Sequence, residues 1–446
     1  MVPAQAPTLV SELPNKLRVA SESTGGETAT LGMWIDTGSR YETDANNGVA
    51  HFLEHMAFKG TAKRTQLQLE TEVENMGGHL NAYTSREQTV YYAKVLKKDV
   101  PKAVELLSDI LTNSTFNEQA VEREREVILR EMEEVESITE EVIFDMLHEA
   151  AFVGTPLART ILGPVQNIQS ITADDIKAYV KTHYTADRMV FAASGAVDHD
   201  ELAGLVGNHF GGVPTEAPAG YSFEYQPSLF SGADVRDYND DMEHGHFALA
   251  FEGLRWTDPD IFSLMLVQSL LGTYDAKKTG LDLTGAKLAS DLAKLDSGAV
   301  QLMQPFCTCY NDTGLFGVYV QTEMGKKEAV DEIIGTIQEE IVAVTTGVTD
   351  DALAAAKAQL KYNMMVQMDG TTPNAEEIGR QMLAYGRRMS LAETFARIDA
   401  IEADDVTRVA DKVIWDQEIA FAGMGPNLKY IYDINGLRRG TFWNRL

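Results

Sequence analysis

Residues 51–55 read His51-Phe52-Leu53-Glu54-His55, five residues that decide the class of this protein. Two residues four positions apart lie one above the other on a helix, so both imidazoles point to the same side. Glu54 lies in the same helical turn and can reach a water molecule held there. Two imidazoles and a carboxylate suit Zn²⁺, which keeps one position open for water at catalytic sites. The pattern predicts a catalytic zinc site; the alternative is a surface helix that carries these residues by coincidence.

The residues around this stretch predict a mixture of strands and helices. Apolar side chains alternate on one face of residues 28–35, as in a strand. Asn46-Asn47-Gly48 is expected to start the histidine helix, and Gly60-Thr61 is expected to end it. Further helices are expected over residues 65–76, from Pro101 onward, over 118–138 and over 173–182, and further strands over 79–84, 89–93 and 189–195.

The long charged helix carries two carboxylates on its apolar side. Glu124 and Glu131 are seven residues apart and share a face with Ile128. A carboxylate on an apolar face is costly unless it is paired or bound to a metal. A solvated face is the usual meaning of such an acidic run and stays open as the alternative. The helix is expected to continue through Glu141 and Asp145, which are four residues apart.

Composition and charge limit the function classes. A chain of 446 residues is too long for one ordinary core, so two domains of roughly 200 residues are expected. The net charge of −29 argues against a nucleic-acid partner and would attract a basic substrate, although a well-solvated surface explains much of it. No stretch approaches the ~18 unbroken apolar residues of a membrane span. The N-terminus shows no Arg-rich leader, as expected of a mature form or of a chain made without one.

The sequence repeats itself after 230 residues. Residues 171–176 (ITADDI) resemble residues 401–406 (IEADDV), and each segment is followed by a helix and an apolar strand. This repetition predicts two homologous halves, 1–213 and 231–446, joined by a linker over 214–230 that is rich in Pro, Gly and Ser. Only the first half can hold the metal, because position 51 corresponds to Leu281 in the second half and no His follows His246.

Residues 51–61 (HFLEHMAFKGT) resemble the zinc-site segment of the pitrilysin-type metallopeptidases, which carry the inverted motif H-x-x-E-H. The resemblance is closest to the mitochondrial processing peptidases and the related core subunits of respiratory complex III. It extends along nearly the whole chain, through residues 78–87, 154–157, 312–317 and 438–443. It favours the catalytic β-type subunit. The α-type subunit carries a glycine-rich loop, and near the corresponding place this chain has only residues 272–280.

This resemblance implies roles for the residues at the metal. His51, His55 and Glu131 would hold Zn²⁺, and Glu131 stands 76 residues after the second His, as in the family. Glu54 would be the catalytic base. Glu124, seven residues before Glu131, would support the ligands.

The resemblance also implies substrate-binding residues. Asn81 and Ala82 match the edge strand that pairs with the extended substrate backbone. Glu141 and Asp145 match an acidic pair that receives an arginine just before the cleavage point.

The fold, partners and location follow from the same resemblance. The implied fold is α+β, with two homologous α/β domains, each a mainly antiparallel sheet packed with helices, that form half of a clam-shell chamber. The implied partners are an α-type processing peptidase subunit, the equivalent of core subunit 2, and basic presequence peptides. The implied location is the mitochondrial matrix, free or attached to the inner membrane with the other subunits of complex III. The alternatives are a structural core subunit of ubiquinol–cytochrome c reductase without important peptidase activity, and a bacterial peptidase.

Overall fold

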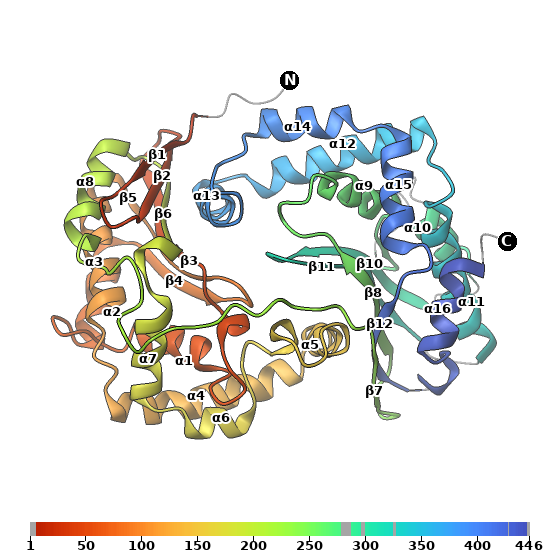
Figure 1. Ribbon diagram of the computed structural model, residues 1–446, viewed down its shortest axis with the longest axis horizontal. Helices are drawn as coiled ribbons and strands as arrows, with labels where there is room; N and C mark the ends of the chain where they lie inside the picture. The colour runs from red at the N-terminus through yellow and green to blue at the C-terminus, as the bar shows by residue number, and fades with distance from the viewer. Residues whose placement is uncertain (1–5, 278–286, 296–298, 324–326, 427, 444–446) are drawn as a thin grey trace. The chain divides into compact units, whose positions relative to one another are not determined.

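The structure is a computed structural model that describes residues 6–277, 287–295, 299–323, 327–426 and 428–443 (Figure 1). The chain forms two compact units, and neither is continuous in sequence. The first unit comprises the residues up to Glu134, then Arg159–Gln226 and Met365–Leu391. The second unit comprises Val135–Ala158, Pro227–Met364 and the residues from Ala392 onward. The passage between Gln226 and Pro227 lies inside the predicted linker.

A six-stranded sheet forms the centre of the first unit. Its strands are β1 (Leu9–Glu12), β2 (Arg18–Ser23), β3 (Thr28–Ile35), β4 (His79–Thr84), β5 (Thr89–Leu96) and β6 (Met189–Gly195). Their order is β1-β2-β6-β3-β5-β4, and every pair is antiparallel except β2 with β6. The predicted alternation along β3 holds, since Leu31, Met33 and Ile35 are fully buried in the core. The sheet leaves β4 at an edge.

The second unit repeats this pattern. Its strands are β7 (Asp234–Tyr238), β8 (Gly245–Gly253), β9 (Tyr274–Asp275), β10 (Val300–Cys309), β11 (Gly314–Thr322) and β12 (Ile419–Gly425), in the order β7-β12-β8-β11-β10-β9. β7 and β12 are parallel, as β2 and β6 are, and the neighbouring pairs are antiparallel. Both sheets are packed with helices, which confirms the expected α+β class and the duplication of the architecture.

The helices cover these sheets. The first half of the chain supplies α1 (Val49–Ala57), α2 (Gln66–Met76), α3 (Val100–Asn113), α4 (Glu118–Glu136), α5 (Thr139–Ala151), α6 (Val165–Ser170), α7 (Ala173–His183) and α8 (His199–Phe210). The second half supplies α9 (Ile261–Leu271), α10 (Lys287–Leu292), α11 (Lys327–Ala343), α12 (Asp350–Gln367), α13 (Thr371–Tyr385), α14 (Leu391–Ala400), α15 (Ala403–Ile414) and α16 (Ile434–Trp443). Among the described residues, no helix has the length and apolar character needed to cross a bilayer.

The long charged helix does not continue through Glu141 and Asp145, so that expectation is wrong. α4 ends at Glu136, Ile138 has extended backbone angles, and α5 begins at Thr139. Glu140 and Glu141 occupy the first turn of α5, where acidic side chains favour a new helix N-terminus. The break lets the chain leave the first unit and place α5 on the other sheet.

Each half of the sequence gives one helix to the sheet of the other half. α5 packs against β12 and β8, and α13 packs against β6 and β3 (Figure 1). Ile143 and Leu147 of α5 are fully buried in the second unit, and burial of such a side chain contributes roughly 1.5–3 kcal/mol. On α13, a Cβ at Gly379 would overlap the ring of Trp34, so this close approach of helix and sheet requires glycine.

The middle of the predicted linker belongs to the first unit. Three aromatic side chains alternate along it, and each faces a cation. Tyr221 lies over Lys181 at 5.0 Å, Phe223 over Arg188 at 4.4 Å and Tyr225 over Arg40 at 4.8 Å. Cation–π contacts of this kind contribute about 0.5–1 kcal/mol each at exposed sites, so the linker is a docked segment.

Candidate metal centre

Helix α1 carries the predicted motif and is held at its N-terminus by Glu42. The Glu42 carboxylate accepts hydrogen bonds from the backbone N–H of Gly48 at 2.9 Å and of Ala50 at 2.7 Å, and from the side chain of Asn47 at 2.7 Å. The two backbone donors belong to the start of the helix, where N–H groups have no partner within the helix. Burial raises the pKa of Glu42 to about 7, although the three hydrogen bonds oppose that rise.

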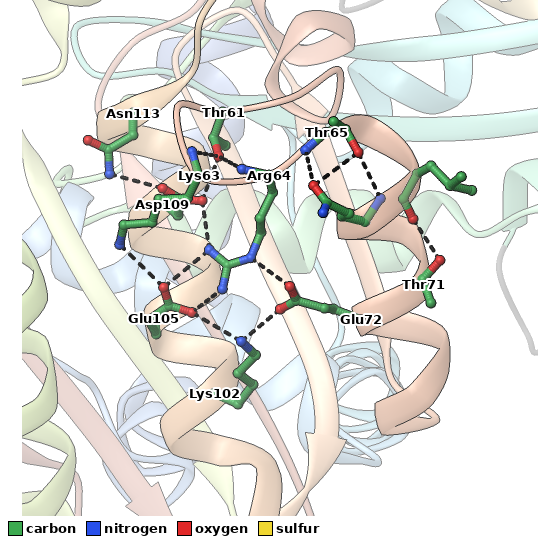
Figure 2. Close-up of polar contacts among 12 residues, drawn as sticks. Thr61, Lys63, Arg64, Thr65, Thr71, Glu72, Lys102, Glu105, Asp109 and Asn113 are labelled. Atoms are coloured by element: carbon green, nitrogen blue, oxygen red, sulfur yellow. Dashed lines mark hydrogen bonds and ion pairs between the residues drawn. The ribbon is translucent and has the colours of Figure 1, made fainter.

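The segment after α1 is anchored by Arg64, as Figure 2 shows. Its guanidinium donates to Glu72 at 3.0 Å, to Asp109 at 2.7 Å and to Glu105 at 2.5 Å. The Thr61 hydroxyl also donates to Asp109, at 2.7 Å. Burial opposes the ionisation of Glu105, yet the hydrogen bonds and charge of Arg64 lower its pKa to about 2. Ion pairs therefore tie the chain after the motif to α2 and α3.

The three predicted ligands meet in the first unit. His55 Nε2 lies 3.0 Å from one Glu131 carboxylate oxygen, and His51 Nε2 lies 3.6 Å from the other. One ligand atom of each residue lies within 4.8 Å of the other two. Glu131 comes from α4, where it lies on the same face as the buried Ile128, three residues earlier. The sequence-predicted ligand set is thus brought together by two helices.

The electrostatics of these residues fit a bound cation. Hydrogen bonds from His51 and His55 hold the pKa of Glu131 far below its usual range. Burial would lower the pKa of His55, but the hydrogen bond and charge of Glu131 raise it. A metal ion bound between these side chains would replace the contacts of the two imidazoles with Glu131. Two imidazole nitrogens and a carboxylate form the usual protein donor set of a catalytic Zn²⁺, which takes water as its fourth ligand.

Glu124 lies beside His55, one of the predicted ligands. One carboxylate oxygen lies 3.5 Å from His55 Nδ1, and the other lies 2.8 Å from Lys59 Nζ. A carboxylate behind a ligand imidazole fixes its orientation and tautomer. The sequence analysis did not predict a role for Lys59. Its position four residues after His55 could have indicated that it lies on the same side as that imidazole. His51 Nδ1 is buried and has no hydrogen-bond partner among the described residues.

Glu54 is half-buried next to the predicted ligand His55, and the edge strand β4 contacts it. The hydroxyl of Thr84, the last residue of β4, donates a 2.7 Å hydrogen bond to Glu54 Oε2. The sequence placed Thr84 within a strand but showed nothing of this contact, which joins residues thirty positions apart.

The residues expected to bind substrate fall in two places. Asn81 and Ala82 lie on β4, which is an edge strand as the resemblance implied. Glu141 and Asp145 lie one turn apart on α5, in the second compact unit. Glu141 is exposed and Asp145 is half-buried. Residues 278–280 of the predicted loop segment, and Leu281, lie outside the described residues.

The duplicated fold and the inverted motif with its distant Glu together define a metallopeptidase of the inverted-motif class. Residues 18–165 match the family model described as Insulinase (Peptidase family M16), and residues 170–360 match the Peptidase M16 inactive domain. The chain therefore belongs to peptidase family M16. The second match agrees with the sequence-based inference that only the first half carries the ligands.

Curated relatives cover nearly the full chain. The chain is 48% identical over 444 residues to mitochondrial-processing peptidase subunit beta of Homo sapiens, covering 98% of this chain and 88% of that protein. It is 49% identical over 432 residues to the subunit of the same name from Blastocladiella emersonii, covering 97% of this chain and 91% of that protein. Its fold is similar to that of a chain in complex III2 from Candida albicans with Inz-5 bound, with a TM-score of 0.86 and 23% sequence identity. The match covers 98% of this chain and 100% of that chain. These findings confirm the family resemblance.

Proposed function

We propose that this chain is the catalytic, β-type subunit of a zinc endopeptidase that removes N-terminal presequences from proteins imported into mitochondria. The observation that carries the proposal is the convergence of His51, His55 and Glu131 within 4.8 Å, with Glu54 beside them. The identity of about half of the aligned residues to mitochondrial-processing peptidase β subunits supports the substrate class. The intact ligand set favours a peptidase over a purely structural core subunit.

The side chains of the site divide the chemistry among them. His51, His55 and Glu131 would hold Zn²⁺. When bound, the ion polarises the scissile carbonyl and lowers the pKa of a water molecule toward ~7. Glu54 takes the proton of the attacking water and later delivers it to the leaving amine. Glu124 keeps His55 in place, and such supporting groups are typically worth ~10–100-fold in metal affinity or activity.

The substrate would bind as an added strand. The backbone of β4 at Asn81 and Ala82 lies at the sheet edge, where an extended peptide can form main-chain hydrogen bonds. Presequences are basic and poor in acidic residues, and a chain with a net charge of −29 attracts them. We propose the mitochondrial matrix as the location, either in a free heterodimer or attached to the matrix side of the inner membrane within complex III.

The isolated chain is expected to fold but to cleave presequence peptides poorly until an α-type subunit is added. The reason is that the α-type subunit supplies the glycine-rich substrate loop, which the sequence of this chain does not match. Cleavage of a fluorogenic presequence peptide, measured with the chain alone and with the α-type subunit, tests this and the proposed function together. Full activity of the purified monomer would instead indicate a self-sufficient peptidase, and copurification with a respiratory complex would indicate the integrated form.

The double variant Glu141→Gln with Asp145→Asn is expected to cleave substrates with Arg two residues before the cut ~10–150-fold less efficiently. Two carboxylates one turn apart can hold the guanidinium fork, and each charge-assisted bond is worth ~1.5–3 kcal/mol. A substrate with Ala at that position should be barely affected. kcat/KM for both substrates is the measurement.

A matched control for this pair is Glu140→Gln with Glu149→Gln. Both residues are exposed on the same helix, so the control removes the same charge from α5. It should leave the preference for arginine unchanged. An equal loss on both substrates in the first double variant would show that Glu141 and Asp145 support the fold and do not recognise arginine.

A further inference from the structure

Thr84 connects the edge strand to the catalytic base. Its hydroxyl donates a 2.7 Å hydrogen bond to Glu54 Oε2, and both side chains are half-buried. Thr84 lies on the same face of β4 as Ala82, two residues earlier. β4, the edge strand proposed to bind the substrate backbone, therefore also contacts Glu54, the proposed base.

The backbone at Thr84 is held firmly. The turn after it is closed by hydrogen bonds from Ser85 N–H to the Gln88 carbonyl at 2.7 Å and from Arg40 N–H to the Arg86 carbonyl at 2.9 Å. Gly38 packs so closely on this turn that a Cβ there would overlap the carbonyl oxygens of Ser85 and Arg86. A donor on such a rigid frame can restrain the side chain that it contacts.

We propose that Thr84 is a positioning residue for Glu54. Its hydroxyl engages Oε2 and so leaves Oε1 to take the proton of the attacking water. Without this donor the carboxylate can rotate about its terminal torsion, which is a soft one, and the oxygen that faces the water is no longer defined. The inference rests on the proposed peptidase function and adds the residue that aligns the base.

Thr84→Val keeps the shape of the side chain and removes the donor. In the complex with the α-type subunit it is expected to lower kcat by about 10- to 100-fold, the range for loss of a hydrogen bond to a charged group, with KM changed less than about 2-fold. Metal content, measured by elemental analysis, should equal that of the wild type. Thr84→Ser, which keeps the hydroxyl, should recover most of kcat.

The matched control is Thr89→Val. Thr89 is the cross-strand partner of Thr84, and its buried hydroxyl donates to the Thr37 carbonyl at 3.0 Å, away from Glu54. This control should lower the unfolding temperature yet keep kcat close to the wild-type value. A kcat loss in Thr89→Val as large as in Thr84→Val would overturn the proposal, because it would indicate a general effect of disturbing the strand end. Wild-type kcat in Thr84→Val, or a Thr84→Ser variant as slow as Thr84→Val, would overturn it as well.

A second measurement does not depend on turnover. Thermal unfolding of metal-free wild type, Thr84→Val, Glu54→Ala and the double variant forms a double-mutant cycle. Thr84→Val should lower the unfolding temperature by roughly 2–4 °C in the wild-type background and by much less when Glu54 is already Ala. Additive effects would overturn the proposed contact. If the wild-type complex cleaves no presequence but the cycle shows coupling, the proposed function fails and the contact stands.

Discussion

Glu54→Gln is expected to keep its metal and to lose turnover by ~10²–10⁴-fold, the usual contribution of a positioned acid–base group. The amide has nearly the shape of the carboxylate and can still accept the Thr84 hydrogen bond, but it cannot take a proton from water. The three ligands are untouched, so metal content should match the wild type. Elemental analysis beside kcat for a presequence peptide measures both quantities.

The control for this variant is Glu126→Gln, an exposed carboxylate on α4. It makes the same change of charge away from the ligands and should leave kcat unchanged. An active Glu54→Gln protein would remove Glu54 from the role of base, whereas loss of metal in it would show that Glu54 helps to hold the ion.

Glu131→Ala and His51→Ala are each expected to lose both metal and activity. Each removes one of three ligands that lie within 4.8 Å of one another, and a site with two protein ligands holds Zn²⁺ far more weakly. The measurements are elemental analysis after dialysis and peptide cleavage. Glu133→Ala, an exposed residue two positions further along α4, should keep both properties and serves as the control. A Glu131→Ala protein with full metal content would refute the ligand assignment.

The metal-free protein gives a second readout for Glu131, with a defined dependence on pH. The lowered pKa of Glu131 contributes stability above its ordinary value of 4.5, and this stability is lost as the pH falls through the lowered pKa. The raised pKa of His55 contributes stability below its ordinary value of 6.5, which is lost as the pH rises through the raised pKa. The pair therefore stabilises the fold most between these two ordinary values. Glu131→Ala should lower the unfolding temperature in that window and have less effect above it.

Much of the metal centre could be predicted from the sequence because the relevant spacing is local. The helical repeat alone puts His51 and His55 on one side, and it puts Glu124 and Glu131 on the face that Ile128 buries. Period-two alternation likewise predicted β3 at its observed limits. The pairing of Glu131 with the two histidines needed the family spacing, since no local pattern says which helix packs on which.

The contacts that complete the site were decided only by the tertiary structure. The partners of these side chains lie on other elements: Thr84 contacts Glu54, Lys59 contacts Glu124 and Arg64 contacts Asp109. Sequence periodicity carries no information on such partners. The exchange of α5 and α13 has the same origin. After the break at Glu136, α5 packs on the sheet of the second unit, and Gly379 lets α13 approach Trp34 on the sheet of the first unit. The sequence by itself thus predicted many helices and strands of the first half, though not the break after Glu136, and the types of the candidate ligands, because these follow from short-range periodicity and side-chain chemistry. The hydrogen bond between Thr84 and Glu54 and the helix exchange depend on long-range packing, which only the folded chain defines.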